Sequence, residues 1–352
     1  MRRFLLAAVV LLAGACGGTT TPTPPPPPAE EPPKITCPAP MTIQLAGTAS
    51  SATVAFTTTF VNGKAPVTVA CTPPSGSSFG LGQSTVTCTA TDILQRSSPC
   101  SFTITVTPAP KLTLTRFVTF GDSITAGEDG IDGGPDTSGL CLPRVTSTAL
   151  FQPRVILPEA QTYPGQLRAL LSARYPTQSP AVLNRGCPGE PVTGLRTRPR
   201  FDAIISTGQY DAVLILEGSN DLDSAARTDP ATQEGVVGSA AAALRLLVDD
   251  AKAASVRPFL ATIPPMSAAG RRGVGAALVT KLNDRIRQIG GAENMAIVDV
   301  YAAFNGNLGL IGDDGLHPNA AGYQKIADTF FTAIRSTLEV TAMTTGSPTV
   351  RR

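Results

Sequence analysis

The chain has no tryptophan, one histidine among 352 residues and only 5% aromatic residues. A metal site built from several histidines is therefore excluded, and any catalysis by an imidazole must use His317. Net charge is also scarce, because 28 Lys and Arg nearly cancel 26 Asp and Glu. The resulting charge of +2 gives no field strong enough to favour a polyanionic partner, so we expect no nucleic-acid binding.

The length and composition indicate a folded protein with more than one domain. Hydrophobic residues make up 42% of the chain and charged residues 15%, which is too apolar for a largely disordered polypeptide. A chain of 352 residues is about twice the usual domain size. We expect two folded units plus some non-globular sequence.

Residues 1–16 have the pattern of an export signal. Two arginines precede the apolar stretch 4–12, and small residues then lead to Cys16. The segment resembles a bacterial lipoprotein signal, which implies that Cys16 is lipidated and anchors the protein to a membrane. The proline-rich residues 17–34 predict an extended spacer. We expect an exported lipoprotein held at the cell surface or in the periplasm, with an ordinary secreted protein as the alternative.

The cysteines agree with an oxidising compartment. The chain has seven, and the six that follow Cys16 fall into two groups. The first group has four members and the second has two: Cys37, Cys71, Cys88 and Cys100, then Cys141 and Cys187. Four cysteines allow three pairings, and the sequence does not choose among them. For the second group we expect a bridge between Cys141 and Cys187.

Residues 35–107 are rich in Thr, Ser and Val, and their short runs of alternating polarity predict a small antiparallel β-sandwich. The segment resembles the HYR (hyalin repeat) domain, an immunoglobulin-like module, through four blocks: 35–38, 71–77, 86–92 and 100–102. The resemblance implies adhesion or spacing outside the cell. Binding of a glycan or protein ligand and a rigid spacer both remain open.

After a linker at 108–113, residues 114–338 alternate apolar strands with helical patterns, and 339–352 read as a flexible tail. This order is typical of an α/β domain with a doubly wound parallel sheet. The five expected strands are 117–120, 181–184, 212–216, 258–263 and 296–300. The expected helices are 163–173, 238–255, 274–289 and 319–338.

Polar segments follow the first, second, third and last of the expected strands, and ligands bind outside the carboxyl ends of the strands in such sheets. They are Gly121-Asp122-Ser123-Ile124, residues 184–189, Gly218-Ser219-Asn220-Asp221 and residues 314–318. In this order they resemble blocks I, II, III and V of the SGNH (GDSL-type) hydrolase family, over residues 114–338. The resemblance implies an SGNH-type fold and an esterase or lipase-like hydrolase that acts on ester bonds without a cofactor.

The chemistry of these residues favours a serine nucleophile. A serine hydroxyl needs a base within hydrogen-bond reach, and His317 is the only imidazole. Asp314, three residues before it, can fold back onto the other ring nitrogen and orient the ring. We therefore predict Ser123, His317 and Asp314 as catalytic residues.

The family resemblance also implies donors for the oxyanion of an acyl-transfer intermediate. They are the backbone N–H groups of Ser123 and Gly189 and the side-chain amide of Asn220. Asp122 and Asp221 are expected to be structural hydrogen-bond acceptors instead. The Cys187-Pro188 pair replaces the small polar pair often found in this block, which leaves the pocket floor open.

A long insertion over 127–161 carries Cys141, and a bridge to Cys187 would hold it beside the active site. The favoured function is an exported ester hydrolase whose partner is an ester substrate of lipid, glycan or small-molecule type. Two alternatives remain: an O-acyltransferase that uses the same triad, and a non-catalytic surface adhesion protein.

Overall fold

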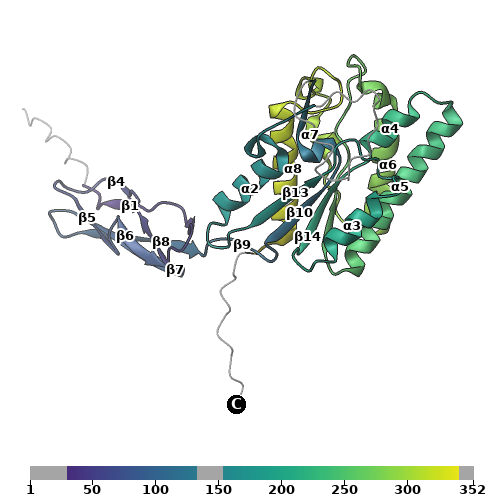
Figure 1. Cartoon of the computed structure of the whole chain (residues 1–352). Coiled ribbons are helices and arrows are strands. Elements are labelled where there is room, and N and C mark those ends of the chain that lie inside the picture. Colours follow the sequence, from purple (N-terminus) through teal and green to yellow (C-terminus); the bar gives the residue numbers. More distant parts are fainter. Residues whose placement is uncertain (1–29, 133–153, 341–352) are drawn as a thin grey trace, which may run out of the picture. The chain divides into compact units, whose positions relative to one another are not determined.

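The computed structural model describes residues 30–132 and 154–340 (Figure 1). Its contacts divide the described chain into two compact units, one holding residues 30–40, 54–77 and 85–103 and the other holding 41–53, 78–84 and the described residues from 104 to 340. Cys16 and Cys141 lie outside the described residues, so neither the predicted anchor nor residues 133–153 of the predicted insertion are part of this description. No helix within 30–132 or 154–340 is long and apolar enough to cross a membrane.

The N-terminal part is rich in β-strands, as predicted. Its sheets pair β1 (Lys34–Thr36) with β4 (Thr59–Val61), β3 (Ser51–Val54) with β6 (Ser77–Gly80), and β2 (Met41–Gln44), β8 (Ser97–Thr107), β7 (Gly82–Thr91) and β5 (Thr68–Thr72) in that order. The expectation of purely antiparallel pairing is wrong for β2, which lies parallel to β8. Parallel neighbours need a long crossover, and here the intervening strands of the module supply it.

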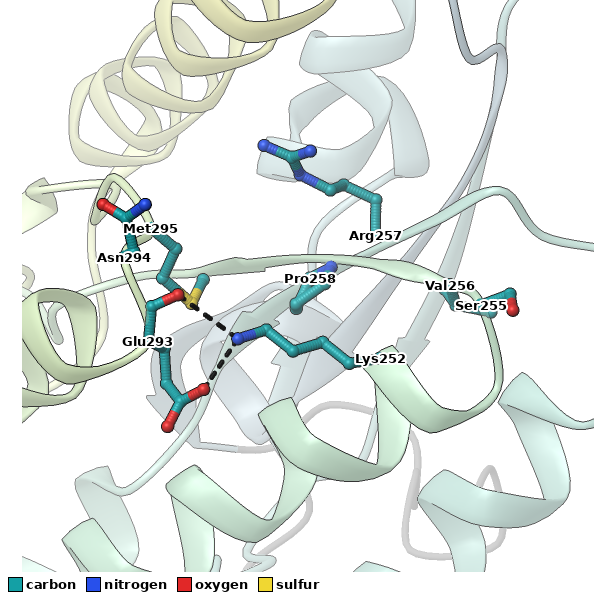
Figure 2. Close-up of a pocket in the computed structure, with 8 residues that line it drawn as sticks. All are labelled: Lys252, Ser255, Val256, Arg257, Pro258, Glu293, Asn294 and Met295. Atoms are coloured by element: carbon teal, nitrogen blue, oxygen red, sulfur yellow. Dashed lines mark hydrogen bonds and ion pairs between the residues drawn. The ribbon is translucent and has the colours of Figure 1, made fainter.

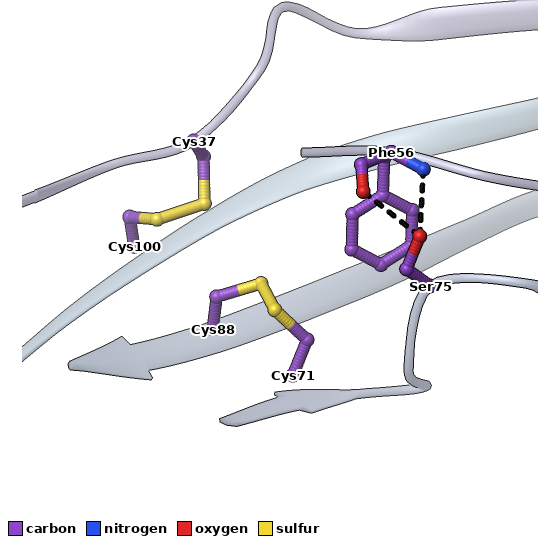
Figure 3. Close-up of a disulfide and its surroundings, with 6 residues drawn as sticks. All are labelled: Cys37, Phe56, Cys71, Ser75, Cys88 and Cys100. Carbon is purple, nitrogen blue, oxygen red and sulfur yellow. Dashed lines mark hydrogen bonds between the residues drawn. A yellow bond between two sulfur atoms is a disulfide. The ribbon is translucent and has the colours of Figure 1, made fainter. Parts of the chain in front are cut away.

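The four cysteines of this part form two disulfides, which settles the pairing that the sequence left open (Figure 3). Cys37 bonds to Cys100, and Cys71 bonds to Cys88. The second bridge joins residues that are direct partners in the antiparallel β5–β7 pair. Beside these bridges the Ser75 hydroxyl accepts the backbone N–H of Phe56 at 2.9 Å and donates to its carbonyl oxygen at 2.8 Å (Figure 3).

The C-terminal unit contains a parallel sheet of four strands. Their order is β13 (Ala181–Gly186), β10 (Arg116–Gly121), β14 (Ala212–Leu216) and β15 (Arg257–Leu260). The predicted fifth strand at 296–300 is reduced to one parallel bridge between Val298 and Ala261. The strand stops there because the Asp299 side chain accepts the N–H of Ala302 and starts α7 (Val300–Phe304).

Helices cover both faces of this sheet (Figure 1). α2 (Tyr163–Arg174) and α8 (Ala320–Leu338) pack on one face, and α3 (Thr197–Ile205), α5 (Pro230–Ala253) and α6 (Ala276–Ala292) lie on the other. The four predicted helices are present, but α5 begins at Pro230 rather than at residue 238. The Asp229 carboxylate accepts the N–H groups of Ala231 and Thr232, and proline fits the first turn.

The strand order places the predicted site at the switch point of the sheet. The chain first runs from β10 to β13 on one side and then to β14 on the other. Loops that leave neighbouring strands in opposite directions open a crevice at their carboxyl ends, where ligands of such folds bind. The buried strand β14 fixes this edge, since all five of its residues are buried.

Candidate active site

Ser123 lies two residues after the end of β10, at the first residue of the short helix α1 (Ser123–Ala126). The turn before it is tight: a Cβ on Gly121 would lie 2.1 Å from the Leu216 carbonyl oxygen and from the Thr125 hydroxyl. Only glycine fits there, and the serine is held at the carboxyl edge of the sheet with 1% of its surface exposed.

Ser123, His317 and Asp314 form a continuous hydrogen-bonded chain. The Ser123 Oγ lies 2.8 Å from Nε2 of His317, and Nδ1 of the same ring lies 2.6 Å from Oδ2 of Asp314. The His317 side chain is fully buried. The structure thus brings together the three predicted catalytic residues, although Ser123 and His317 are 194 positions apart in the sequence. In this arrangement a proton can pass from the serine to the histidine.

The turn that carries Asp314 and His317 is fixed from both sides. Oδ1 of Asp314 accepts the N–H groups of Leu316 at 2.9 Å and His317 at 3.0 Å. Gly270 packs against the turn, since a Cβ there would lie 2.3 Å from the Asp314 carbonyl carbon. Burial alone would raise the pKa of Asp314, but its hydrogen bonds from His317 and the backbone hold that pKa well below its ordinary value.

The loop that contains Gly189 is held between the serine turn and the asparagine segment. Cys187 donates its N–H to the Gly121 carbonyl at 2.7 Å, and Nδ2 of Asn220 donates to the Glu190 carbonyl at 3.0 Å. Gly189 itself adopts a positive φ of 76°, a conformation that favours glycine. All three predicted oxyanion donors therefore come from segments that contact one another.

Asp221 accepts three hydrogen bonds from this same loop, in the structural role expected for it. Its carboxylate binds the N–H of Val192 at 2.7 Å and both the N–H and the hydroxyl of Thr193, at 3.1 and 2.6 Å. The bonds tie α4 (Ser219–Ala225) to the Gly189 loop. They lower the pKa of Asp221, but burial raises it by more.

A buried ion pair between Arg200 and Glu190, which the sequence did not predict, holds the Gly189 loop in place. The Arg200 guanidinium binds the Glu190 carboxylate through Nε and Nη2 and stacks 4.0 Å above the centre of the Phe120 ring. Its Nη1 donates to the Arg185 carbonyl at 2.8 Å. Arg200 thereby fixes the residue whose carbonyl orients Asn220. The pairing could not be read from the sequence because Arg200 belongs to α3, a helix that no pattern predicted.

Two further carboxyl groups are buried: Asp122, which precedes the nucleophile, and Glu217, which follows β14 and feels the charge of Asp122. Oδ1 of Asp122 accepts the N–H of Ile124 at 2.9 Å, whereas Oδ2 of Asp122 and both oxygens of Glu217 have no hydrogen-bond partner among the described residues. Burial raises the pKa of Asp122 to about 6. Burial, together with repulsion from neighbouring carboxylates, raises the pKa of Glu217 well above its ordinary value.

Glu128 is the most direct contact that sequence reasoning missed. It begins β11 (Glu128–Asp132), and its Oε2 lies 3.2 Å from Nε2 of His317, the same nitrogen that faces Ser123. Burial lowers the pKa of His317, but hydrogen bonds to Asp314 and Glu128 raise it by more, so that it lies above its ordinary value. The one available signal was an acidic residue shortly after the nucleophile.

Three other candidate features are a cysteine of the Gly189 loop, a separate pocket and possible metal sites. Cys187 is disulfide-bonded, but its predicted partner Cys141 is outside the described residues, so that pairing stays a prediction. A pocket of about 370 Å³ lies at the amino end of β15, lined by Lys252, Arg257, Glu293 and Met295 among others, and includes none of the predicted site residues (Figure 2). Among residues 30–132 and 154–340, no group of three or more His, Cys, Asp or Glu side chains could hold a metal ion.

Comparison with known families identifies both parts of the chain. The model of the GDSL-like Lipase/Acylhydrolase family matches residues 119–325, and the HYR domain model matches residues 29–106. No curated protein matches.

Several solved structures resemble part of this chain. An acetylxylan esterase from Geobacillus stearothermophilus is 24% identical, with a TM-score of 0.45 over 62% of this chain and 94% of its own. LAE5, an α/β hydrolase enzyme from a Lake Arreo metagenome, is 26% identical with the same TM-score and coverage. A lipase/acylhydrolase from Enterococcus faecalis is 20% identical, with a TM-score of 0.46 over 63% of this chain and 97% of its own.

Proposed function

Since this chain belongs to the GDSL-like lipase/acylhydrolase family and is an ester hydrolase, we propose that it cleaves carboxylic esters through an acyl intermediate on Ser123. The observation that carries the proposal is the buried chain of hydrogen bonds from Ser123 through His317 to Asp314. A serine becomes a useful nucleophile only beside such a base, and the base must itself be oriented.

The reaction follows from the positions of these atoms. Oγ of Ser123 attacks the ester carbonyl carbon while its proton passes to Nε2 of His317. The tetrahedral intermediate collapses when Nε2–H gives that proton to the leaving alcohol oxygen, which leaves an acyl-serine. Water then attacks the acyl carbon with His317 as base, and the released serine takes back the proton. Asp314 accepts from Nδ1–H throughout, which keeps Nε2 directed at the reacting atoms.

Three donors are proposed for the negative oxygen of each tetrahedral intermediate: the N–H groups of Ser123 and Gly189 and the amide of Asn220. One N–H of the Asn220 amide is used on the Glu190 carbonyl, which orients the group and leaves its second N–H for the oxyanion. Preorganised donors of this kind are usually the largest single contribution to acyl transfer.

We further propose that the enzyme is exported and anchored through lipidated Cys16, with the HYR-type part outside the cell. The signal-like residues 1–16 support this, and so do the disulfides Cys37–Cys100 and Cys71–Cys88, because such bonds persist in oxidising compartments. Labelling expressing cells with a fatty-acid analogue should mark the wild-type protein and not Cys16→Ser. Equal labelling of both would refute the anchor.

The ester-hydrolase proposal is tested with p-nitrophenyl esters of graded chain length and with acetylated sugars. Ser123→Ala and His317→Ala should each lower turnover by at least about 10³-fold, without adding to one another in the double variant. Ser239→Ala, which changes an exposed serine on α5, is the matched control. A Ser123→Ala variant with near wild-type turnover contradicts the mechanism, and acylated sugar or alcohol in place of free acid would show transfer rather than hydrolysis.

A further inference from the structure

A second carboxylate reaches the histidine on the side that faces the nucleophile. Nε2 of His317 lies 2.8 Å from Oγ of Ser123 and 3.2 Å from Oε2 of Glu128, while Asp314 occupies the opposite side of the ring. We propose that Glu128 is a positioning residue that stabilises the His317 imidazolium formed each time Ser123 releases its proton. The inference rests on the proposed function, because it assigns His317 the role of base.

The structure holds Glu128 firmly in this place. Its backbone pairs with Ile156 of β12 (Arg154–Ile156), and its carbonyl accepts the Tyr323 hydroxyl at 2.5 Å. The side chain is only 6% exposed. Arg272 approaches the same Oε2 to 3.9 Å and donates its backbone N–H to the Asp314 carbonyl at 2.8 Å, so one residue links the supports of both carboxylates.

The proton count shows which state of the histidine this contact favours. In the neutral ring with the proton on Nδ1, the lone pair of Nε2 accepts the serine hydroxyl, and an ionised Glu128 oxygen can only present another lone pair. In the imidazolium, Nε2–H can donate to that oxygen. The contact is therefore unfavourable before proton transfer and favourable after it.

Two effects of opposite sign on activity follow. Because Glu128 stabilises the protonated ring, it raises the pKa of His317 in the free enzyme, so a higher pH is needed before the neutral base is available. Above that pH it stabilises the charge that develops in the transition state, so turnover is higher than with Asp314 alone. A residue with a purely structural role would change neither the pH profile nor the titration of the ring.

Within residues 30–132 and 154–340, several other ionisable groups act on the ring or on Glu128. Asp314 faces Nδ1. Asp122 interacts electrostatically with His317, and its carboxylate has the same charge sign as that of Glu128. Arg272 has the opposite sign and lies beyond Glu128, and the Tyr323 hydroxyl is committed to the Glu128 carbonyl. Since Asp314 is retained, removing the Glu128 charge should reduce the upward shift of the His317 pKa without abolishing it.

The test uses the fact that the full chain has one histidine, so a single imidazole appears in an NMR titration. In Glu128→Gln the His317 pKa should fall by about one unit, the usual effect of losing an adjacent charge. The acid limb of kcat/KM should move down by the same amount, and plateau kcat should fall about 3- to 10-fold. Glu234→Gln, an exposed glutamate on α5, is the matched control and should leave all three unchanged.

Circular dichroism would show whether Glu128→Gln misfolds, and a second, more conservative variant keeps the test valid in that case. Glu128→Asp keeps the charge but withdraws it by one methylene, so its pKa change should have the same direction and a smaller size. A His317 pKa that is unchanged or raised in both variants overturns the proposal, and so does a lowered pKa with an unmoved pH–rate profile. The titration needs no activity, and therefore a failure of this inference is distinguishable from retained activity in Ser123→Ala, which would refute the proposed function itself.

Discussion

We predict that the free energy of unfolding of Asp122→Asn, relative to that of the wild type, increases from acid to neutral pH. The Asp122 carboxyl is 1% exposed and accepts one backbone N–H, from Ile124. Burial raises its pKa from 3.8 to about 6, against the lowering effects of that hydrogen bond and of the His317 charge. Asparagine keeps the accepting oxygen and removes the ionisation.

The magnitude follows from proton linkage. Between the ordinary pKa of 3.8 and the folded value of about 6, the unfolded chain releases the Asp122 proton and the folded protein keeps it. The contribution of Asp122 to wild-type stability therefore falls as pH rises through this window and is level above it. About two pKa units at 1.4 kcal/mol each correspond to about 3 kcal/mol. The stability difference between Asp122→Asn and wild type should grow by about this amount from pH 4 to pH 7, or by about 6–12 °C in Tm for a domain of this size.

Urea unfolding at several pH values, followed by far-UV circular dichroism, measures this difference. The helices of the described residues all lie between 123 and 338, so the helical signal reports the C-terminal unit. Asp229→Asn is a control with a lower pH window: hydrogen bonds from Thr232 and Ala231 lower the pKa of Asp229 below 3.8, so that variant should lose stability relative to wild type only as pH rises toward 3.8 and should differ little between pH 4 and pH 7. A stability difference for Asp122→Asn that is the same at pH 4 and pH 7 would refute the reasoning.

Two further predictions concern the active-site loops. Asn220→Ala should lower kcat by about 10²-fold or more with little change in KM, the size expected for one lost oxyanion donor; a change confined to KM would make Asn220 a substrate-binding residue instead. Peptide mapping of the alkylated, non-reduced protein by mass spectrometry should find Cys187 joined to Cys141. Alkylation of either cysteine in active protein would rule out that bridge.

The part of the site that could be predicted is the part encoded locally. Asp314 and His317 are three residues apart, so one turn suffices to bring their side chains together, and the structure joins them at 2.6 Å. Ser123 and Asn220 follow strands whose apolar runs are easily recognised, and parallel strands deliver such residues to one edge. The family blocks supplied the order of these segments.

The parts that escaped prediction depend on distant packing. Glu128 meets His317 only because β11 returns beside the turn after 314, which no spacing in the sequence specifies. The cysteine pairing depended on the register of β5 with β7, and hydrophobic alternation is compatible with more than one register. The prediction of a fifth strand at 296–300 was wrong for a local reason. Asp299 caps the helix that begins at Val300, and this ends the extended segment.

The distribution of buried acids suggests how the site keeps two opposite charges apart. On the side of the oxyanion donors, Glu190 is neutralised by Arg200, and Asp221 is surrounded by three donors from Val192 and Thr193. On the side of the base, Asp314 and Glu128 both face the imidazole. An oxyanion and an imidazolium form together in each step, and uncompensated carboxylates near the first would cancel what its donors provide. The charges of Glu190 and Asp221 are thus compensated beside the proposed oxyanion position, whereas two carboxylates face the ring. Removing Arg200 should therefore lower turnover by leaving the Glu190 charge without its partner, and removing Glu128 should lower it by weakening the base.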